Sequence, residues 1–130
     1  MNLKIILVED DYPTIELYKE VFKFAKMELE IFAWGEEMIE YLKEVREGRK
    51  EKPDLILLDL ILADINGLEI LKEVRKYPET KDIKIFALTN YTDEELNREL
   101  IKEKIDKILV KTEYTPKKLI RLVKKTFKLK

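Results

Sequence analysis

Residues 53 to 71, Pro-Asp-Leu-Ile-Leu-Leu-Asp-Leu-Ile-Leu-Ala-Asp-Ile-Asn-Gly-Leu-Glu-Ile-Leu, contain an apolar run that ends at a single carboxylate. Every residue from 55 to 58 is apolar, which is typical of a strand buried on both faces of a parallel sheet that helices cover. Asp59 then lies at the carboxyl end of this strand, where such sheets bind their ligands. An isolated aspartate at this point most often organises a turn, so its role depends on its neighbours.

Strands and helices alternate along the rest of the chain. Apolar runs predict further strands at residues 3–8, 29–34, 83–88 and 107–110. Apolar positions at helical spacing predict a helix opened by Pro13, helices over 36–45 and 68–77, a helix from a capping box at Thr92 and Glu95 to about Glu103, and a last helix capped by Thr115 with Pro116 at its first position. Five such units predict an α/β fold with a doubly wound, five-stranded parallel sheet.

The composition limits the possible functions. The 130 residues fit one domain, residues 1–130, and we expect no output domain. Lys and Arg number 26 and Asp and Glu 27, so no net charge favours direct nucleic-acid binding or an anionic membrane. The absence of cysteine and histidine excludes disulfides, thiolate catalysis, His-ligated metals and a phosphohistidine on this chain.

Two further compositional features bear on the setting of the protein. The chain has no secretion signal and no apolar stretch approaching the roughly 20 residues of a membrane span, so we expect a cytoplasmic protein without membrane contact. Charged residues make up 41% of the chain, mostly as Lys and Glu, which is typical of a hyperthermophile or of an idealised sequence.

Polar residues follow four of the five predicted strands. They are Glu9-Asp10-Asp11, Asp59, Thr89 and Lys111. Taken singly, a lysine is most often solvated, a threonine often ends a strand, and an acidic run often begins a helix. At one edge of a sheet, however, carboxylates without His or Cys suit Mg²⁺, and an ammonium and a hydroxyl suit phosphoryl oxygens. This grouping indicates that Asp59 is a nucleophile that forms an aspartyl phosphate.

Four stretches together carry a family resemblance. They are Lys4-Ile-Ile-Leu-Val-Glu-Asp-Asp11, Pro53-Asp-Leu-Ile-Leu-Leu-Asp59 with Asn66-Gly67 following, Ile85-Phe-Ala-Leu-Thr89 and Ile108-Leu-Val-Lys111. In these stretches, and over essentially its whole length, the chain resembles the receiver domain of two-component response regulators, in their stand-alone single-domain form. The resemblance implies a flavodoxin-like (βα)5 fold with strand order 2-1-3-4-5.

The resemblance also implies roles for individual residues. Asp59 would accept a phosphoryl group from a histidine kinase, a phosphotransfer protein or a small phosphodonor. Glu9, Asp10, Asp59 and the backbone carbonyl of Ile61 would hold Mg²⁺, with Glu9 acting through water. Thr89 and Lys111 would contact the phosphoryl group and report its presence. The protein would catalyse its own phosphorylation and dephosphorylation without being a turnover enzyme, and would signal to a downstream protein through residues 92–127.

Four positions depart from the family pattern. Ala63 replaces a usual proline, which we expect to loosen its loop. Thr112 replaces the proline that follows the lysine through a cis peptide, and because a non-proline cis bond costs roughly 3 kcal/mol we predict a trans bond and a repositioned loop. Ile108 stands where the family has a mobile aromatic, and Asn90 replaces a small residue and crowds access to the site.

Two hypotheses follow from these departures. Tyr91 or Tyr114, near Thr89 and Lys111 in sequence, takes the place of the missing mobile aromatic. Ile61, two residues after Asp59, cannot orient an attacking water as an amide or carboxylate would, so we expect a long-lived aspartyl phosphate.

Three other functions compete with this one. A flavodoxin-type cofactor binder would need a Gly-, Ser- or Thr-rich loop after the first strand, where 9–11 are acidic. A haloacid-dehalogenase-type phosphatase would need an acid at position 61. The remaining alternative is a non-signalling receiver-like interaction module or engineered scaffold, which Ile108, Thr112 and the Lys/Glu-rich surface favour and the set of Asp10, Asp59, Thr89 and Lys111 opposes.

Overall fold

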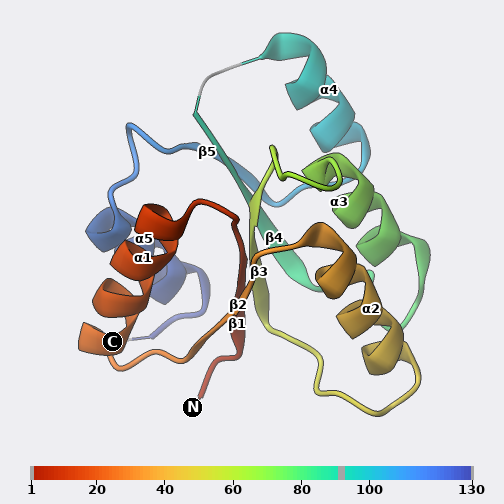
Figure 1. Ribbon diagram of the computed structural model, residues 1–130, viewed down its shortest axis with the longest axis horizontal. Coiled ribbons are helices and arrows are strands. Elements are labelled where there is room, and N and C mark those ends of the chain that lie inside the picture. Colours follow the sequence, from red (N-terminus) through yellow and green to blue (C-terminus); the bar gives the residue numbers. More distant parts are fainter. Residues whose placement is uncertain (1, 91–92, 130) are drawn as a thin grey trace.

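The structure, a computed structural model, describes residues 2–90 and 93–129 and contains a parallel sheet between two layers of helices (Figure 1). The strands are β1 (Ile5–Val8), β2 (Leu29–Phe32), β3 (Leu55–Asp59), β4 (Lys84–Thr89) and β5 (Lys107–Val110). The helices are α1 (Tyr12–Phe24), α2 (Gly35–Arg46), α3 (Gly67–Lys76), α4 (Glu94–Lys102) and α5 (Pro116–Thr126). The alternation of five strands and five helices predicted from the sequence is confirmed.

The strand order is β2-β1-β3-β4-β5, and every neighbouring pair is parallel. This is the flavodoxin-like order that the family resemblance implied. The register pairs Val8 with Leu58 and Asp59 with Leu88, so β1, β3 and β4 end at nearly the same level. Residues that follow these strands are therefore brought to one edge of the sheet.

Alternate side chains of the strands fill two separate cores. On β1, Ile5 and Leu7 join the cluster beneath α1 and α5, whereas Ile6 and Val8 join the cluster beneath α2, α3 and α4. Figure 1 shows these two helical layers on opposite sides of the sheet. All five residues of β3 are buried, as its apolar run predicted. Within the described residues, none of the helices has the length and apolar character needed to cross a membrane.

Several element boundaries differ from the sequence-based prediction. β2 ends at Phe32 and not at Trp34, because Trp34 is already the N-cap of α2 and Gly35 its first residue. The N-cap of α4 is Asp93, whose side chain accepts a hydrogen bond from the Leu96 N–H at 3.1 Å. Thr92, which the capping-box pattern favoured, lies outside the described residues. An aspartate directly before the first helical turn caps it as well as a threonine would.

The predicted turn at Asn66 and Gly67 fixes how α3 leaves the end of β3. The Asn66 side chain accepts a hydrogen bond from the Leu68 N–H at 2.9 Å and caps the helix. A Cβ atom at Gly67 would lie 2.7 Å from the carbonyl oxygen of Asp59. Only glycine therefore lets α3 begin directly against the residue that ends β3.

Candidate functional site

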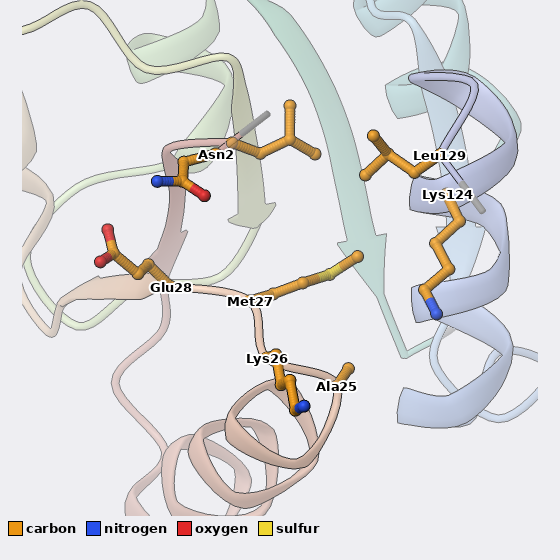
Figure 2. A pocket seen from close by; sticks show the side chains of 8 residues that line it. Asn2, Ala25, Lys26, Met27, Glu28, Lys124 and Leu129 are labelled. Carbon is orange, nitrogen blue, oxygen red and sulfur yellow. The ribbon is translucent and has the colours of Figure 1, made fainter.

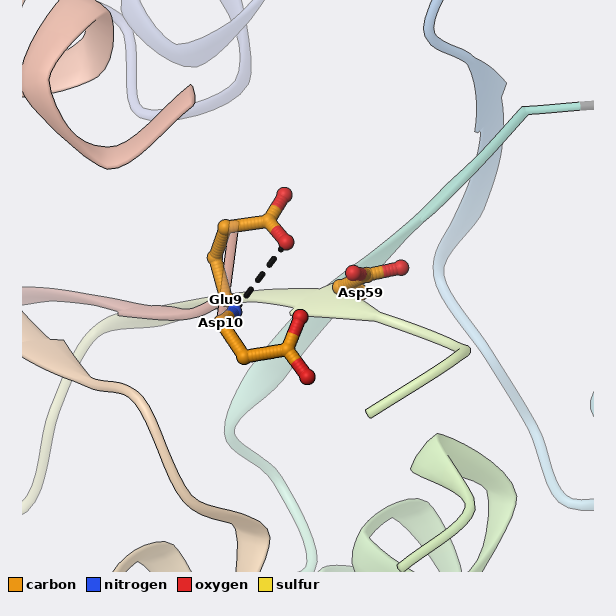
Figure 3. A group of neighbouring side chains, drawn as sticks. All are labelled: Glu9, Asp10 and Asp59. Atoms are coloured by element: carbon orange, nitrogen blue, oxygen red, sulfur yellow. Dashed lines mark hydrogen bonds between the residues drawn. The ribbon is translucent and has the colours of Figure 1, made fainter. Parts of the chain in front are cut away.

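Three carboxylates meet at the carboxyl edge of the sheet. One carboxylate oxygen from each of Glu9, Asp10 and Asp59 lies within 4.8 Å of the others. Figure 3 shows the Glu9 and Asp10 side chains extending from the end of β1 toward Asp59 at the end of β3. Glu9 is 0% exposed and Asp59 7% exposed, so two of the three acids are withdrawn from water. Burying two carboxylates side by side is costly unless a positive charge compensates them.

Glu9 is held by donors that follow the ends of two strands, β1 and β5. Its Oε2 accepts hydrogen bonds from the backbone N–H groups of Asp10 at 3.2 Å and Asp11 at 3.3 Å. Its Oε1 accepts a hydrogen bond from Lys111 Nζ at 2.7 Å. The ion pair between Glu9 and Lys111 therefore joins the end of β1 to the end of β5, across the whole site.

Lys111 and Thr89 lie where the sequence predicted. The Lys111 Nζ is 3.7 Å from Asp59 Oδ2, farther than it is from Glu9. The Lys111 backbone N–H donates to the Thr89 carbonyl oxygen at 2.7 Å, so the two residues are fixed to each other. Thr89 is 5% exposed and follows Leu88, the register partner of Asp59. An ammonium and a hydroxyl-bearing residue thus flank Asp59 on its β4–β5 side.

The environment of Asp59 favours its protonated form. Burial, and after it the neighbouring Glu9 carboxylate, raise the pKa of Asp59 to about 7, although the Lys111 ammonium and the Ile61 N–H act in the opposite direction. Burial, and after it the charges of Glu9 and Asp59, raise the pKa of the Tyr18 hydroxyl to about 12. The excess of negative charge is therefore felt as far as the inner face of α1.

The donor set fits a hard divalent cation. Carboxylate oxygens without nitrogen or sulfur ligands suit Mg²⁺ or Mn²⁺, and a cation would relieve the repulsion that raises the Asp59 pKa. Asp10 is the least buried of the three acids, and its Oδ2 accepts a hydrogen bond from the Ala63 N–H at 2.7 Å. Ile61 contributes its N–H to Asp59 Oδ1 at 3.2 Å, while the ligand role of its carbonyl stays a prediction.

Three residues near the site have roles that the sequence did not predict. Asp11, the last acid of the run after β1, caps α1 by accepting from the Thr14 N–H at 3.2 Å and so does not join the other carboxylates. Asp64 accepts hydrogen bonds from the first residues of α2. Tyr18 was assigned to the apolar stripe of α1, which is correct, but its hydroxyl is in the field of the acids. The only signal in the sequence is that Trp34 cannot cap α2, which indicates a missing acceptor but does not identify Asp64.

The departures from the family pattern have structural counterparts. No cis peptide occurs in the described residues, so the predicted trans bond before Thr112 is confirmed. Ile108 packs against the core beneath α2, α3 and α4, whereas Tyr114 packs against the core beneath α1 and α5. Tyr91 lies outside the described residues. Tyr114 is therefore on the opposite side of the sheet from the position that the family aromatic would occupy.

A separate pocket of about 280 Å³ lies at the other end of the sheet (Figure 2). It is lined by residues that precede β1, join α1 to β2, or lie in or after α5, namely Asn2, Leu3, Ala25, Lys26, Met27, Glu28, Lys124 and Leu129. Its charged side chains, Lys26, Glu28 and Lys124, are of mixed sign. The convergent chemistry of the molecule is therefore at the acidic edge and not in this pocket.

Comparison with known proteins agrees with this geometry. Residues 5–124 match the family model of the response regulator receiver domain. The chain belongs to this family. The sequence is 31% identical to sporulation initiation phosphotransferase F of Bacillus subtilis (strain 168) over 76% of this chain and 73% of that protein. Among several curated relatives the match covers from 28% to 73% of their length.

Solved receiver structures superpose on nearly the whole chain. The phosphorylated cyanobacterial phytochrome response regulator RcpA has a TM-score of 0.81 and 28% identity, with 97% of this chain and 91% of that chain covered. The Mn²⁺-bound form of response regulator Rcp1 has a TM-score of 0.77 and 26% identity, with 98% and 95% covered. This protein is thus a receiver domain of two-component signalling, and it has the acidic pocket at which receiver domains bind a divalent cation.

Proposed function

We propose that this receiver domain accepts a phosphoryl group on Asp59, in a Mg²⁺-dependent reaction, from the phosphohistidine of a partner kinase or phosphotransfer protein or from a small phosphodonor. The observation that carries the proposal is the setting of Asp59. Its carboxylate is buried at the end of β3, with the Lys111 ammonium 3.7 Å from one oxygen and two further acids within 4.8 Å. A carboxylate used only for a turn would have no need of these neighbours.

The chemical step is a displacement at phosphorus. An Asp59 carboxylate oxygen attacks the phosphorus atom, a P–O bond forms, and the P–N bond to the donor imidazole, or the P–O bond to acetate in acetyl phosphate, breaks with its electron pair leaving on the donor. The attacking oxygen must be ionised. Because the pKa of Asp59 is about 7, positive charge close to the site increases the ionised fraction at neutral pH.

The other residues stabilise the charge that moves during transfer. Lys111 is placed to meet a phosphoryl oxygen, since it already spans Glu9 and Asp59. Thr89, at the end of the neighbouring strand, is placed to donate its hydroxyl to a second oxygen. Asp10, Asp59 and the Ile61 carbonyl would ligate the metal directly and Glu9 through water. When bound, Mg²⁺ supplies positive charge that offsets the carboxylates and the phosphoryl oxygens.

The output is proposed to pass through a protein surface. We infer that phosphorylation changes the face formed by residues 92–127, which includes α4, β5 and α5 and is tied to the site by the backbone bond from Lys111 to Thr89. The downstream partner is a protein and not a nucleic acid, because the chain carries no strong net charge. We propose the cytoplasm as the setting of this exchange.

A non-signalling receiver-like module is the second candidate function. The observation that favours it is on β5, where the partly buried Ile108 packs against the core and offers no aromatic ring to rotate. In this case the acids would bind a cation and Asp59 would remain unmodified.

One experiment separates the two candidates. The protein is incubated with acetyl phosphate and Mg²⁺, and intact mass spectrometry looks for a single added phosphoryl group. We expect the adduct in the unmodified protein and in Asp82→Asn, which changes an exposed aspartate before β4, but not in Asp59→Asn. Absence of the adduct from the unmodified protein, or its persistence in Asp59→Asn, would contradict the proposal.

A further inference from the structure

The N-terminus of α2 is capped by a residue from another part of the chain. The N-cap residues of α1, α3, α4 and α5 are Asp11, Asn66, Asp93 and Thr115, and each accepts a hydrogen bond from its own helix. The N-cap of α2 is Trp34, which makes no such bond. Because the first N–H groups of a helix have no partner within it, α2 needs an acceptor from outside.

Asp64, in the loop between β3 and α3, is that acceptor. Its Oδ1 accepts from the Gly35 N–H and its Oδ2 from the Glu36 N–H, each at 2.9 Å. These bonds, with that from Glu36 the stronger, hold the pKa of Asp64 below its usual value. Although Asp64 is exposed, both of its oxygens are engaged, and a carboxylate at a helix N-terminus is favoured by the helix dipole.

The loop and the helix are also in close steric contact. A Cβ atom at Gly35 would lie 2.3 Å from Ile65 Cγ1 and 3.3 Å from Asp64 Oδ1. Glycine at the first position of α2 therefore lets the loop approach closely enough for both hydrogen bonds. Trp34 offers no capping side chain and the adjacent Gly35 has no Cβ atom. Both features allow Asp64 to cap α2.

The same loop holds two of the carboxylates at the acidic edge. The Ala63 N–H donates to Asp10 Oδ2 at 2.7 Å, and the Ile61 N–H donates to Asp59 Oδ1 at 3.2 Å. A proline at position 63 has no N–H, so the bond to Asp10 exists because this chain has alanine there. The residue next to this donor is Asp64, which anchors the loop on α2.

We propose that Asp64 is a positioning residue of the cation site: by fixing the loop on the N-terminus of α2, it sets the Ala63 N–H against Asp10 and so orients this carboxylate for a divalent cation. The inference rests on the proposed function only in that the acidic cluster binds Mg²⁺. Outer hydrogen bonds that orient a ligand typically change metal affinity by about 10- to 100-fold. Because coupling is reciprocal, cation binding in turn strengthens the contact between the loop and α2.

The chain carries its own reporter of this coupling. Trp34 is the single tryptophan of the sequence and is half-exposed. It immediately precedes the two residues whose N–H groups donate hydrogen bonds to Asp64. A change in the loop on cation binding therefore alters the surroundings of the indole. Trp34 fluorescence reports on the contact between the loop and the N-terminus of α2, and titration calorimetry measures cation binding itself. Neither measurement depends on phosphorylation.

The test is a titration of the metal-free protein with Mg²⁺ at constant ionic strength. We expect Asp64→Ala to raise the Kd for Mg²⁺ about tenfold, the lower end of the usual range for such outer contacts, and to reduce the Trp34 response. The Kd of Asp64→Asn, which keeps one acceptor oxygen, should lie between those of Asp64→Ala and the unmodified protein. The matched control is Asp93→Ala, which removes the cap of α4 and leaves the Kd unchanged.

A second variant tests the Asp10 contact without touching the cap. Ala63→Pro removes the donor N–H, and we expect it to raise the Kd in the same direction while Asp64 stays on α2. A Kd within twofold of the unmodified protein in both Asp64→Ala and Ala63→Pro, with each variant shown to be folded by urea denaturation, overturns this inference alone. An unmodified protein that binds no Mg²⁺ by calorimetry overturns the cation site, and with it both proposals.

Discussion

The two sides of the site differ in how they are built. On the β1–β3 side, Glu9, Asp10 and Asp59 gather within 4.8 Å and a loop donates backbone N–H groups to two of them. On the β4–β5 side, Lys111 reaches back to the acids, but Ile108 is a partly buried aliphatic residue that packs against the core. Under the proposed function, the chemistry of phosphorylation depends mainly on the first side together with Lys111, and its reporting depends on the second side. Variants on each side should therefore separate the two.

The largest effect is expected from the residue that joins the two sides. Lys111→Met removes the ammonium that lies 2.7 Å from Glu9 and 3.7 Å from Asp59. Loss of one preorganised charge at a reacting centre costs on the order of 100-fold in rate. We therefore expect the phosphorylation rate with acetyl phosphate, followed by intact mass, to fall by about this factor. Lys107→Met, at the exposed start of β5, is the matched control, and equal rates in the two variants would count against the role of Lys111.

The comparison also shows what the sequence could predict. The alternation of strands and helices and the positions of Asp59, Thr89 and Lys111 followed from apolar runs and from the residues after them, since parallel strands end at one edge. The strand order came from the family resemblance. Asp64 and the Ala63 N–H were not predictable in this way, because one acts on a helix 28 to 29 residues away and the other is a backbone group. Such contacts depend on the path of a loop, which no periodicity encodes.

The next effect concerns how the buried carboxylates on the acidic side change the free energy of unfolding. The pKa of Asp59 is raised in the folded protein from 3.8 to about 7, so the protonated form is favoured by folding. This contribution to stability is fully present below about pH 4 and is lost as the pH rises through about 7. In metal-free buffer, the free energy of unfolding of Asp59→Asn, relative to that of the unmodified protein, should rise by on the order of 2 kcal/mol between pH 5 and pH 8. One pKa unit corresponds to about 1.4 kcal/mol.

Urea denaturation at the two pH values, in the presence of a chelator, measures this difference. Adding Mg²⁺ at pH 8 should reduce it, because a cation offsets the same repulsion. Asp82→Asn provides the control for a change at an exposed carboxylate. If the stability difference between Asp59→Asn and the unmodified protein is constant from pH 5 to pH 8, the pKa of Asp59 is not raised in the folded protein.

A smaller effect is expected at Ile61, which follows Asp59 on the acidic side. Its backbone N–H donates to Asp59 Oδ1, and its side chain is 58% exposed, so it can be replaced without disturbing the core. Ile61→Asn places an amide where it can orient a water toward the aspartyl phosphate. We expect the half-life of the phosphorylated protein to fall about tenfold, equivalent to about 1.4 kcal/mol of transition-state stabilisation. Ile61→Leu, which adds no polar group, should leave the half-life unchanged when decay of the adduct is followed by mass.

The smallest effect is expected on the reporting side, at Tyr114. Its backbone N–H donates to the Val110 carbonyl oxygen at 3.1 Å, so it is joined through a short turn to the residue before Lys111. A movement of Lys111 toward a phosphoryl group would reach the Tyr114 ring, which packs beneath α1 and α5 and not beneath α4. With 3-fluorotyrosine incorporated, and Tyr114→Phe used to assign the resonance, beryllofluoride with Mg²⁺ should shift the ¹⁹F signal of Tyr114. An unchanged signal, while Asp59 is shown to bind the mimic, would mean that this ring does not take the place of the missing aromatic.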